Sequence, residues 1–185
     1  MWLNMAREDY QKALKKGERS YARYLSEGKY PYLQVLEELL SHTDVVAEED
    51  LGICSIPSEM IVGTFTAGRR TAFAPNFMPL LDDESEFAAK WQALYNAHLE
   101  EGIHDPIKCY EFMNRYYVLE GNKRVSVLKF CGAPSVQGNV TRIIPKRTDE
   151  PEEHSTKTCA LCEVLEVPRQ RCVLWVCFGQ QPSTR

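Results

Sequence analysis

The sequence contains no apolar run close to the roughly 20 residues that a membrane-spanning helix needs. Its N-terminus lacks the basic-then-apolar order of a signal peptide. Positive charge is not in surplus either, because the 185 residues carry 22 basic and 26 acidic side chains. The net charge is −4 and the sequence pI is about 5.6. We therefore expect a cytoplasmic protein that binds no membrane and that is not, as a whole, a binder of polyanions.

The sequence also lacks the usual catalytic and metal-binding constellations. No Ser-His-Asp or Cys-His arrangement is visible. The seven cysteines are an odd number, and without an export signal we interpret them as reduced thiols. Four of them lie near the C-terminus, but the spacing of the second pair and the absence of a knuckle glycine argue against zinc. These four are Cys159, Cys162, Cys172 and Cys177. We expect no metal site in the protein itself.

The apolar spacing divides the chain into three regions. Residues 1–50 predict a helical hairpin packed on the domain that follows, with a partner-binding or homodimer surface as the alternative. Residues 51–147 read as strand, helix, hairpin, helix and strand, which indicates an α+β domain with a small mixed β-sheet. Its 11 basic and 10 acidic side chains make this the one region without an acidic excess. Residues 148–185 lack the residue patterns typical of turns and helix caps. We interpret them as an irregular tail, either disordered or produced by a frameshift near His154.

The central helix of the middle region has a clear predicted start and end. Asp83 and Glu86 have the spacing of a capping box, with Asp in place of the usual hydroxyl residue. Apolar residues then recur at helical spacing until Gly102. The residues before this helix, 64–76, have no steady period and predict a loop that carries Arg69 and Arg70.

The stretch from Tyr117 to Ser126 is the most informative part of the sequence. It predicts a strand, a sharp turn at Gly121 and the first turn of a helix. Lys123 and Arg124 fall in that first turn, where the positive end of the helix dipole costs an exposed cation about 0.3–1 kcal/mol. An anion at the free N–H groups would reverse this penalty, and phosphate is the usual anion at such a position.

An ordered set of segments resembles the ParB-like domain of the ParB/sulfiredoxin superfamily. The set covers about half of the chain, and the helical leader with the Glu-Gly-Asn-Lys-Arg-Val-Ser core is also similar to ParB-like leader regions of uncharacterised Firmicutes proteins. The matching segments are Ile56-Pro57 with Ile61, Arg69-Arg70, Glu86 to Gly102, Ile103 to Ile107, Tyr117 to Lys129 and Pro134 to Ile144.

The resemblance implies a phosphate cradle at Gly121, Asn122, Lys123 and Arg124. Members of this family that bind nucleotides contact the phosphates through a second pair of basic residues, known as the first basic box. The corresponding residues here are Arg69-Arg70. The implied function is a nucleotide- or phosphate-binding regulatory module, with CTP, ATP or ADP and Mg²⁺ as candidate ligands. Sulfiredoxins carry a catalytic cysteine where this chain has Asn122, so we do not expect their chemistry.

Several alternatives remain open at this point. The cations could simply reach solvent or pair with Glu120. Glu120 could instead hold Mg²⁺ or act as a base in an enzyme for phosphoryl transfer or phosphodiester cleavage, so the sequence leaves catalysis undecided. The domain could also bind DNA or another nucleic acid, although its near-neutral charge predicts weak binding. A protein-interaction role for the helical leader is the last alternative.

Overall fold

The computed structural model describes residues 2–146. The chain divides into two compact units, Met1–Ile144 and Pro145–Arg185, and the fold and site described below belong to the first. The expected irregular tail, its four cysteines and the inferred frameshift lie outside the described residues. Within residues 2–146, no helix has both the length and the apolar character that crossing a membrane requires.

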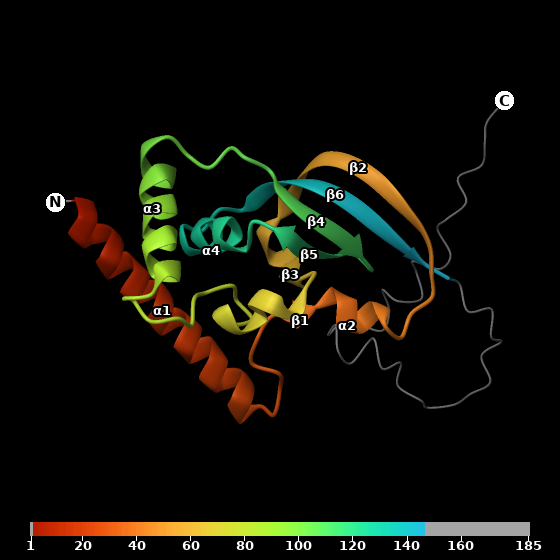
Figure 1. Cartoon of the computed structure of the whole chain (residues 1–185), viewed down its shortest axis with the longest axis horizontal. Helices are drawn as coiled ribbons and strands as arrows, with labels where there is room; N and C mark the ends of the chain where they lie inside the picture. The colour runs from red at the N-terminus through yellow and green to blue at the C-terminus, as the bar shows by residue number, and fades with distance from the viewer. Residues whose placement is uncertain (1, 147–185) are drawn as a thin grey trace. The chain divides into compact units, whose positions relative to one another are not determined.

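The centre of the fold is a mixed sheet of six strands in the order β1-β3-β5-β4-β6-β2 (Figure 1). Strands β1, β3 and β5 run parallel to one another, and β4 runs antiparallel to β5 and parallel to β6. This confirms the predicted α+β class with a mixed sheet. The strands are β1 (Gln34–Val35), β2 (Val45–Pro57), β3 (Ile61–Thr64), β4 (Ile107–Phe112), β5 (Arg115–Glu120) and β6 (Ser135–Pro145).

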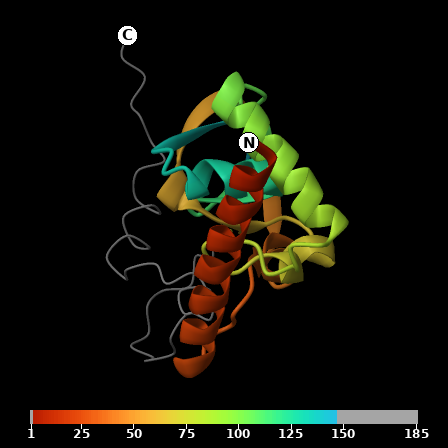
Figure 2. The ribbon, with the colours of Figure 1, turned by 90° about the vertical axis from the view of Figure 1, so that its left-hand side faces the viewer.

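The helices follow one another away from the sheet. Helix α4 contacts β4, α3 packs on α4, and α1 packs on α3, so that α1 and α3 lie side by side (Figures 1 and 2). The helices are α1 (Trp2–Ser26), α2 (Leu36–Leu40), α3 (Glu86–Glu100) and α4 (Asn122–Phe130), with short 3₁₀ turns η1 (Ser58–Met60) and η2 (Ala67–Ala72).

An aromatic cluster joins the three packed helices. Trp91 of α3 is fully buried, stacks on Tyr95 and meets the edge of Tyr10 from α1, with both ring centroids 5.4 Å away. Its indole Nε1 donates a hydrogen bond to Oγ of Ser126 in α4 at 2.9 Å. A buried indole N–H without an acceptor would be costly, so this bond fixes α3 against α4.

The leader is less helical than predicted. The first helix forms, but the segment expected to be a second helix contains β1 and only the five residues of α2. Strand β1 pairs in parallel with β3, where Gln34 lies opposite Gly63, so the leader contributes to the sheet. The predicted division at residue 50 falls inside β2.

The start of α3 also differs from the prediction. Ser85 is the N-cap, and its Oγ accepts a hydrogen bond from the Ala88 backbone N–H at 3.1 Å. Asp83, which the capping-box spacing assigned to this role, instead accepts hydrogen bonds from side chains of α1. A competing tertiary contact therefore takes Asp83 away from the helix end, and the nearer hydroxyl residue replaces it.

Candidate functional site

The candidate site lies at one edge of the sheet, where three parallel strands end. Strand β3 ends at Thr64 and leads into η2, and β5 ends at Glu120 and leads through Gly121 into α4. Loops that follow the carboxyl ends of neighbouring parallel strands meet at the same edge, which is the common position of ligand sites in parallel sheets. The two predicted basic segments are thereby brought to one edge of the fold.

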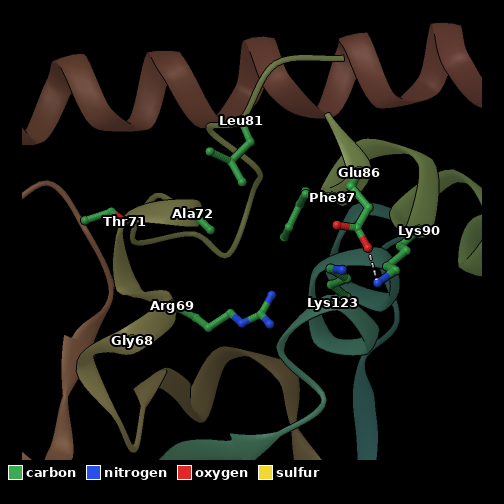
Figure 3. Close-up of a pocket in the computed structure, with 9 residues that line it drawn as sticks. All are labelled: Gly68, Arg69, Thr71, Ala72, Leu81, Glu86, Phe87, Lys90 and Lys123. Atoms are coloured by element: carbon green, nitrogen blue, oxygen red, sulfur yellow. Dashed lines mark ion pairs between the residues drawn. The ribbon is translucent and has the colours of Figure 1, made fainter. Parts of the chain in front are cut away.

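A pocket of about 550 Å³ opens between η2, the start of α3 and the start of α4 (Figure 3). Phe87, Leu81 and Ala72 give it an apolar part, and four charged side chains supply the polar part. The lining residues are Gly68, Arg69, Thr71, Ala72, Leu81, Glu86, Phe87, Lys90 and Lys123.

The pocket carries more positive than negative charge. Its three cations are Arg69, Lys90 and Lys123, and its one carboxylate, Glu86, forms an ion pair with Lys90 at 2.5 Å. Arg69 extends toward Lys123 and has no hydrogen bond or ion pair within residues 2–146 (Figure 3). Within residues 2–146, Arg69 and Lys123 therefore face the pocket without a direct ion pair, and the single carboxylate Glu86, already paired with Lys90, acts on them only at longer range.

The charged form of Lys123 is disfavoured by its surroundings in the pocket. Its Nζ lies 4.7 Å from the centroid of the Phe87 ring, which gives some cation–π stabilisation. Partial burial, followed by the nearby charges of Arg69 and Lys90, lowers the pKa of Lys123 below its ordinary value, and only Glu86 opposes this shift. A bound anion would relieve the repulsion among these cations.

Two helices begin beside the pocket. The first five residues of α3 supply Glu86, Phe87 and Lys90 to the pocket, and the first turn of α4 supplies Lys123. The first N–H groups of a helix lack intrahelical partners and carry the positive end of its dipole. The pocket thus combines the side-chain and backbone features that favour an anion.

The Gly121 turn has the conformation that the sequence predicted. Its φ is 108°, in a region that side-chain-bearing residues rarely adopt, and it is the N-cap of α4. A Cβ here would also lie 2.8 Å from Cγ2 of Ile107. Both observations explain why only glycine allows β5 to turn directly into α4.

Asn122 anchors the same turn to β3. Its Nδ2 donates to Oγ1 of Thr64 at 3.2 Å, and Thr64 Oγ1 in turn donates to the Val118 carbonyl at 3.1 Å. The Asn122 Oδ1 atom is buried and has no hydrogen-bond partner within residues 2–146. Asn122 therefore holds the turn in place and leaves one acceptor unused.

Arg124, predicted as a phosphate ligand, has another role in the described fold. Its Nη1 donates to the backbone carbonyls of Asp105 and Pro106 at 3.0 and 2.8 Å. These contacts tie the first turn of α4 to the loop before β4. The carbonyls offset the unfavourable position of this cation, and Arg124 does not line the pocket.

Arg70 and Glu120 also lie apart from the pocket lining. Arg70 forms an ion pair with Glu38 of α2. Glu120 pairs with Lys108 at 2.8 Å, and this partner lowers the pKa of Glu120. The catalytic role of Glu120 stays a prediction, and its carboxylate lies outside the pocket lining.

The pocket offers little to hold a metal through protein ligands. Within residues 2–146 no three His, Cys, Asp or Glu side chains group together for a metal ion. Mg²⁺ prefers carboxylate oxygens, and the pocket has only Glu86, which is paired with Lys90. The residues that line the pocket therefore fit an anionic ligand better than a protein-bound metal.

Of the predicted site residues, Arg69 and Lys123 meet in the pocket, and Gly121 and Asn122 shape the turn beside it. Sequence reasoning missed Glu86, Phe87 and Lys90 as lining residues. The spacing carried part of the signal, because Glu86 and Lys90 are four residues apart and share one side of the helix, whereas Phe87 lies about 100° away around the axis.

A comparison with solved structures found one similar chain. The crystal structure of sulfiredoxin from Arabidopsis thaliana is similar to this chain with 23% sequence identity, covering 48% of this chain and 82% of that one. The TM-score of this match is 0.33, which is too low to carry a conclusion about ligands or chemistry. No family model and no curated protein matches the chain.

Proposed function

We propose that this domain is a regulatory module that binds a phosphorylated ligand, with nucleotides as the first candidates, in the pocket between η2, α3 and α4. The observation that carries the proposal is the pair Arg69 and Lys123, which face one pocket from two different elements and make no direct ion pair within residues 2–146. Arg suits phosphate because its planar fork can donate two hydrogen bonds at once, and Lys adds a compact charge.

The apolar part of the pocket favours a ligand that is more than free phosphate. Phe87 and Leu81 present carbon surface beside the cations, so a base or another apolar group has a surface to contact. The sequence resemblance to nucleotide-binding ParB-like domains supports CTP, ATP or ADP. Mg²⁺ would arrive on the phosphates, with no direct carboxylate ligand from the pocket.

Isothermal titration with CTP, ATP and ADP, each with and without Mg²⁺, tests the proposal. At least one nucleotide should bind with a Kd below roughly 1 mM, and the affinity should fall as salt is added. Lys123→Met and Arg69→Met should each weaken binding about 10-fold or more, since each removes a charge-assisted hydrogen bond.

Lys15→Met is the matched control, because Lys15 is an exposed cation of α1 outside the pocket lining. It removes the same charge and should leave the affinity within about two-fold of wild type, given the screening of distant surface charges. Absence of heat for all three nucleotides, or equal weakening by Lys15→Met and Lys123→Met, would disprove a specific site.

A further inference from the structure

Helix α1 contacts residues 76–85, the linker segment that precedes α3, along much of its length. The contacts begin near the N-terminal end of the helix and continue for more than two turns. They are the hydrogen bonds from Arg7 and Gln11 to Asp83 (2.9–3.3 Å), from Tyr10 Oη to the Leu81 carbonyl (2.6 Å) and from Asn76 to the Lys16 carbonyl (3.3 Å), and the packing of Gly17 on Pro79.

The Gly17 contact leaves no room for a side chain. A Cβ at this position would lie 2.2 Å from the Pro79 carbonyl oxygen. Ala6, Tyr10 and Ala13 on the same side of α1 are buried at 1%, 0% and 0% exposure. The linker segment therefore packs directly on the helix backbone and cannot shift without disturbing α1.

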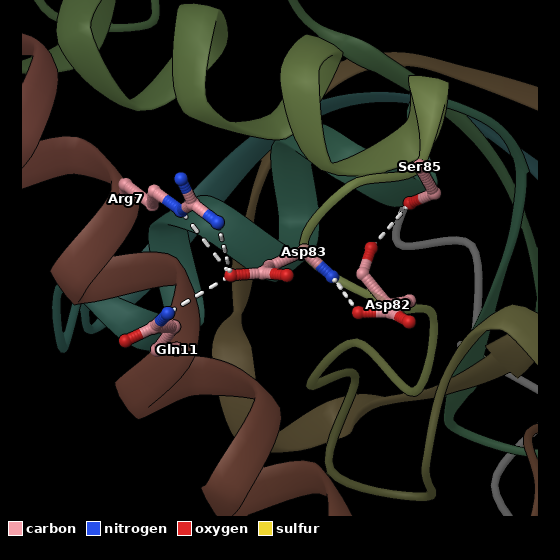
Figure 4. A network of polar contacts seen from close by, with 5 residues as sticks. All are labelled: Arg7, Gln11, Asp82, Asp83 and Ser85. Atoms are coloured by element: carbon pink, nitrogen blue, oxygen red, sulfur yellow. Dashed lines mark hydrogen bonds and ion pairs between the residues drawn. The ribbon is translucent and has the colours of Figure 1, made fainter.

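Asp83 is the shared acceptor of the side-chain hydrogen bonds that join the N-terminal part of α1 to the linker segment (Figure 4). One oxygen, Oδ2, accepts from Nε and Nη2 of Arg7 and from Nε2 of Gln11. These donors lower the pKa of Asp83, with the Gln11 hydrogen bond contributing most. In the next residues Ser85 donates to the Asp82 carbonyl, and Ser85 also caps α3.

The linker segment is at the same time a wall of the candidate pocket. Leu81 lines the pocket, and its carbonyl is the group that Tyr10 holds. Immediately after Ser85, the first five residues of α3 place Glu86, Phe87 and Lys90 in the lining. A displacement of α1 would thus move a wall of the pocket through covalently adjacent residues.

We infer that α1 is a positioning and regulatory element for the pocket: its docking orders residues 81–90, and pocket occupancy and α1 docking stabilise each other. The ordering part stands on the contacts above, and the ligand part rests on the proposed function. Coupling of this kind is reciprocal, so a ligand must stabilise docked α1 to the extent that docked α1 improves ligand affinity.

A charge-reversal cycle tests the inference in the full chain. Arg7→Glu places a carboxylate against Asp83, Asp83→Arg reverses the other partner, and the double variant restores an opposite-charge pair. Lys15→Glu is the control, because it makes the same charge change at an exposed α1 position with no contact to the linker segment. Since Arg7 is exposed on the helix surface, the substitution should not unfold the domain.

Amide hydrogen exchange without ligand is the first measurement. Arg7→Glu should speed exchange across residues 81–90 about five-fold or more, leave β4 and β5 unchanged, and be reversed in the double variant. Unchanged exchange in residues 81–90 would overturn the inference whether or not any nucleotide binds.

Titration with ADP is the second measurement. Arg7→Glu should weaken ADP binding about five-fold, the double variant should recover it, and ADP should slow exchange in α1 of the wild type. Altered exchange with unaltered ADP affinity would overturn the coupling. If Arg7→Glu alters exchange in residues 81–90 while the wild type binds no nucleotide, the proposed ligand would be disproved and the positioning role of α1 supported.

Discussion

The ammonium group of Lys129 is withdrawn from water near the end of α4. Its Nζ donates to the Ile61 carbonyl at 2.7 Å and lies 4.7 Å from the centroid of the Phe77 ring. No carboxylate within residues 2–146 pairs with it, and burial lowers the pKa of Lys129 from 10.5 to about 8. The folded protein therefore holds this proton less tightly than the unfolded chain does.

This difference predicts a specific dependence of stability on pH. Below pH 8 both states are protonated, and the folded state bears the full cost of the buried charge. Between pH 8 and 10.5 the folded state loses the proton first, so the free energy of unfolding rises with pH. A fall from 10.5 to about 8 corresponds to about 3 kcal/mol in total, of which about 2 kcal/mol should appear between pH 7.5 and 10.

Other groups titrate in the same range, so the measurement must be a difference. Burial raises the pKa of Cys109 from 9.0 to about 12, which makes the folded state lose stability above pH 9 and masks part of the lysine effect. Urea unfolding of wild type and Lys129→Met from pH 7 to 10 removes this contribution, because Cys109 is common to both proteins.

The stability of wild type relative to Lys129→Met should rise by about 2 kcal/mol over this range. The exposed control Lys15→Met should run parallel to wild type at every pH. Parallel curves for wild type and Lys129→Met would show that the Lys129 ammonium is solvated in the folded protein, and the reasoning from its burial would be refuted.

Two further predictions concern the pocket and the turn beside it. Gly121→Ala should lower the free energy of unfolding by about 1–3 kcal/mol, because φ is 108° and the new Cβ meets the first residue of β4. Gly68→Ala, where a Cβ meets nothing within 4 Å, should be nearly neutral in the same urea titration. Glu86→Gln should tighten nucleotide binding about two- to five-fold, since it removes the one pocket carboxylate and frees Lys90. Weaker binding in that variant would show that Glu86 contacts the ligand favourably.

Local patterns in the sequence predicted the elements that depend on nearby residues. The β4–β5 hairpin and the start of α4 at Gly121 follow from alternation and glycine chemistry, and the structure confirms both. Met113 and Asn114 take the positive φ values of 51° and 60° that a two-residue hairpin turn requires. These signals lie within about ten residues of the feature that they predict.

Features that depend on long-range contacts were not predictable in the same way. The apolar residues around Leu33 and Leu36 fit a helix, but pairing with β3 draws part of that segment into the sheet. Asp83 has capping-box spacing, yet Arg7 and Gln11, more than 70 residues away, bind it instead. The sequence pattern alone does not show whether such residues will follow their local preference or bind a partner that is distant in the sequence.

The two cations at the start of α4, which the sequence predicted to be phosphate ligands together, have different partners in the folded protein. Arg124 is held by two carbonyls, so Arg124→Met should destabilise the fold by about 1–3 kcal/mol with little effect on nucleotide affinity. Lys123 has a cation–π contact and a helix-end penalty of similar size, so Lys123→Met should leave stability within about 0.5 kcal/mol of wild type. The same variant should lose nucleotide binding. Urea unfolding and titration of both variants separate the two roles, and a binding loss in Arg124→Met equal to that in Lys123→Met would contradict the division.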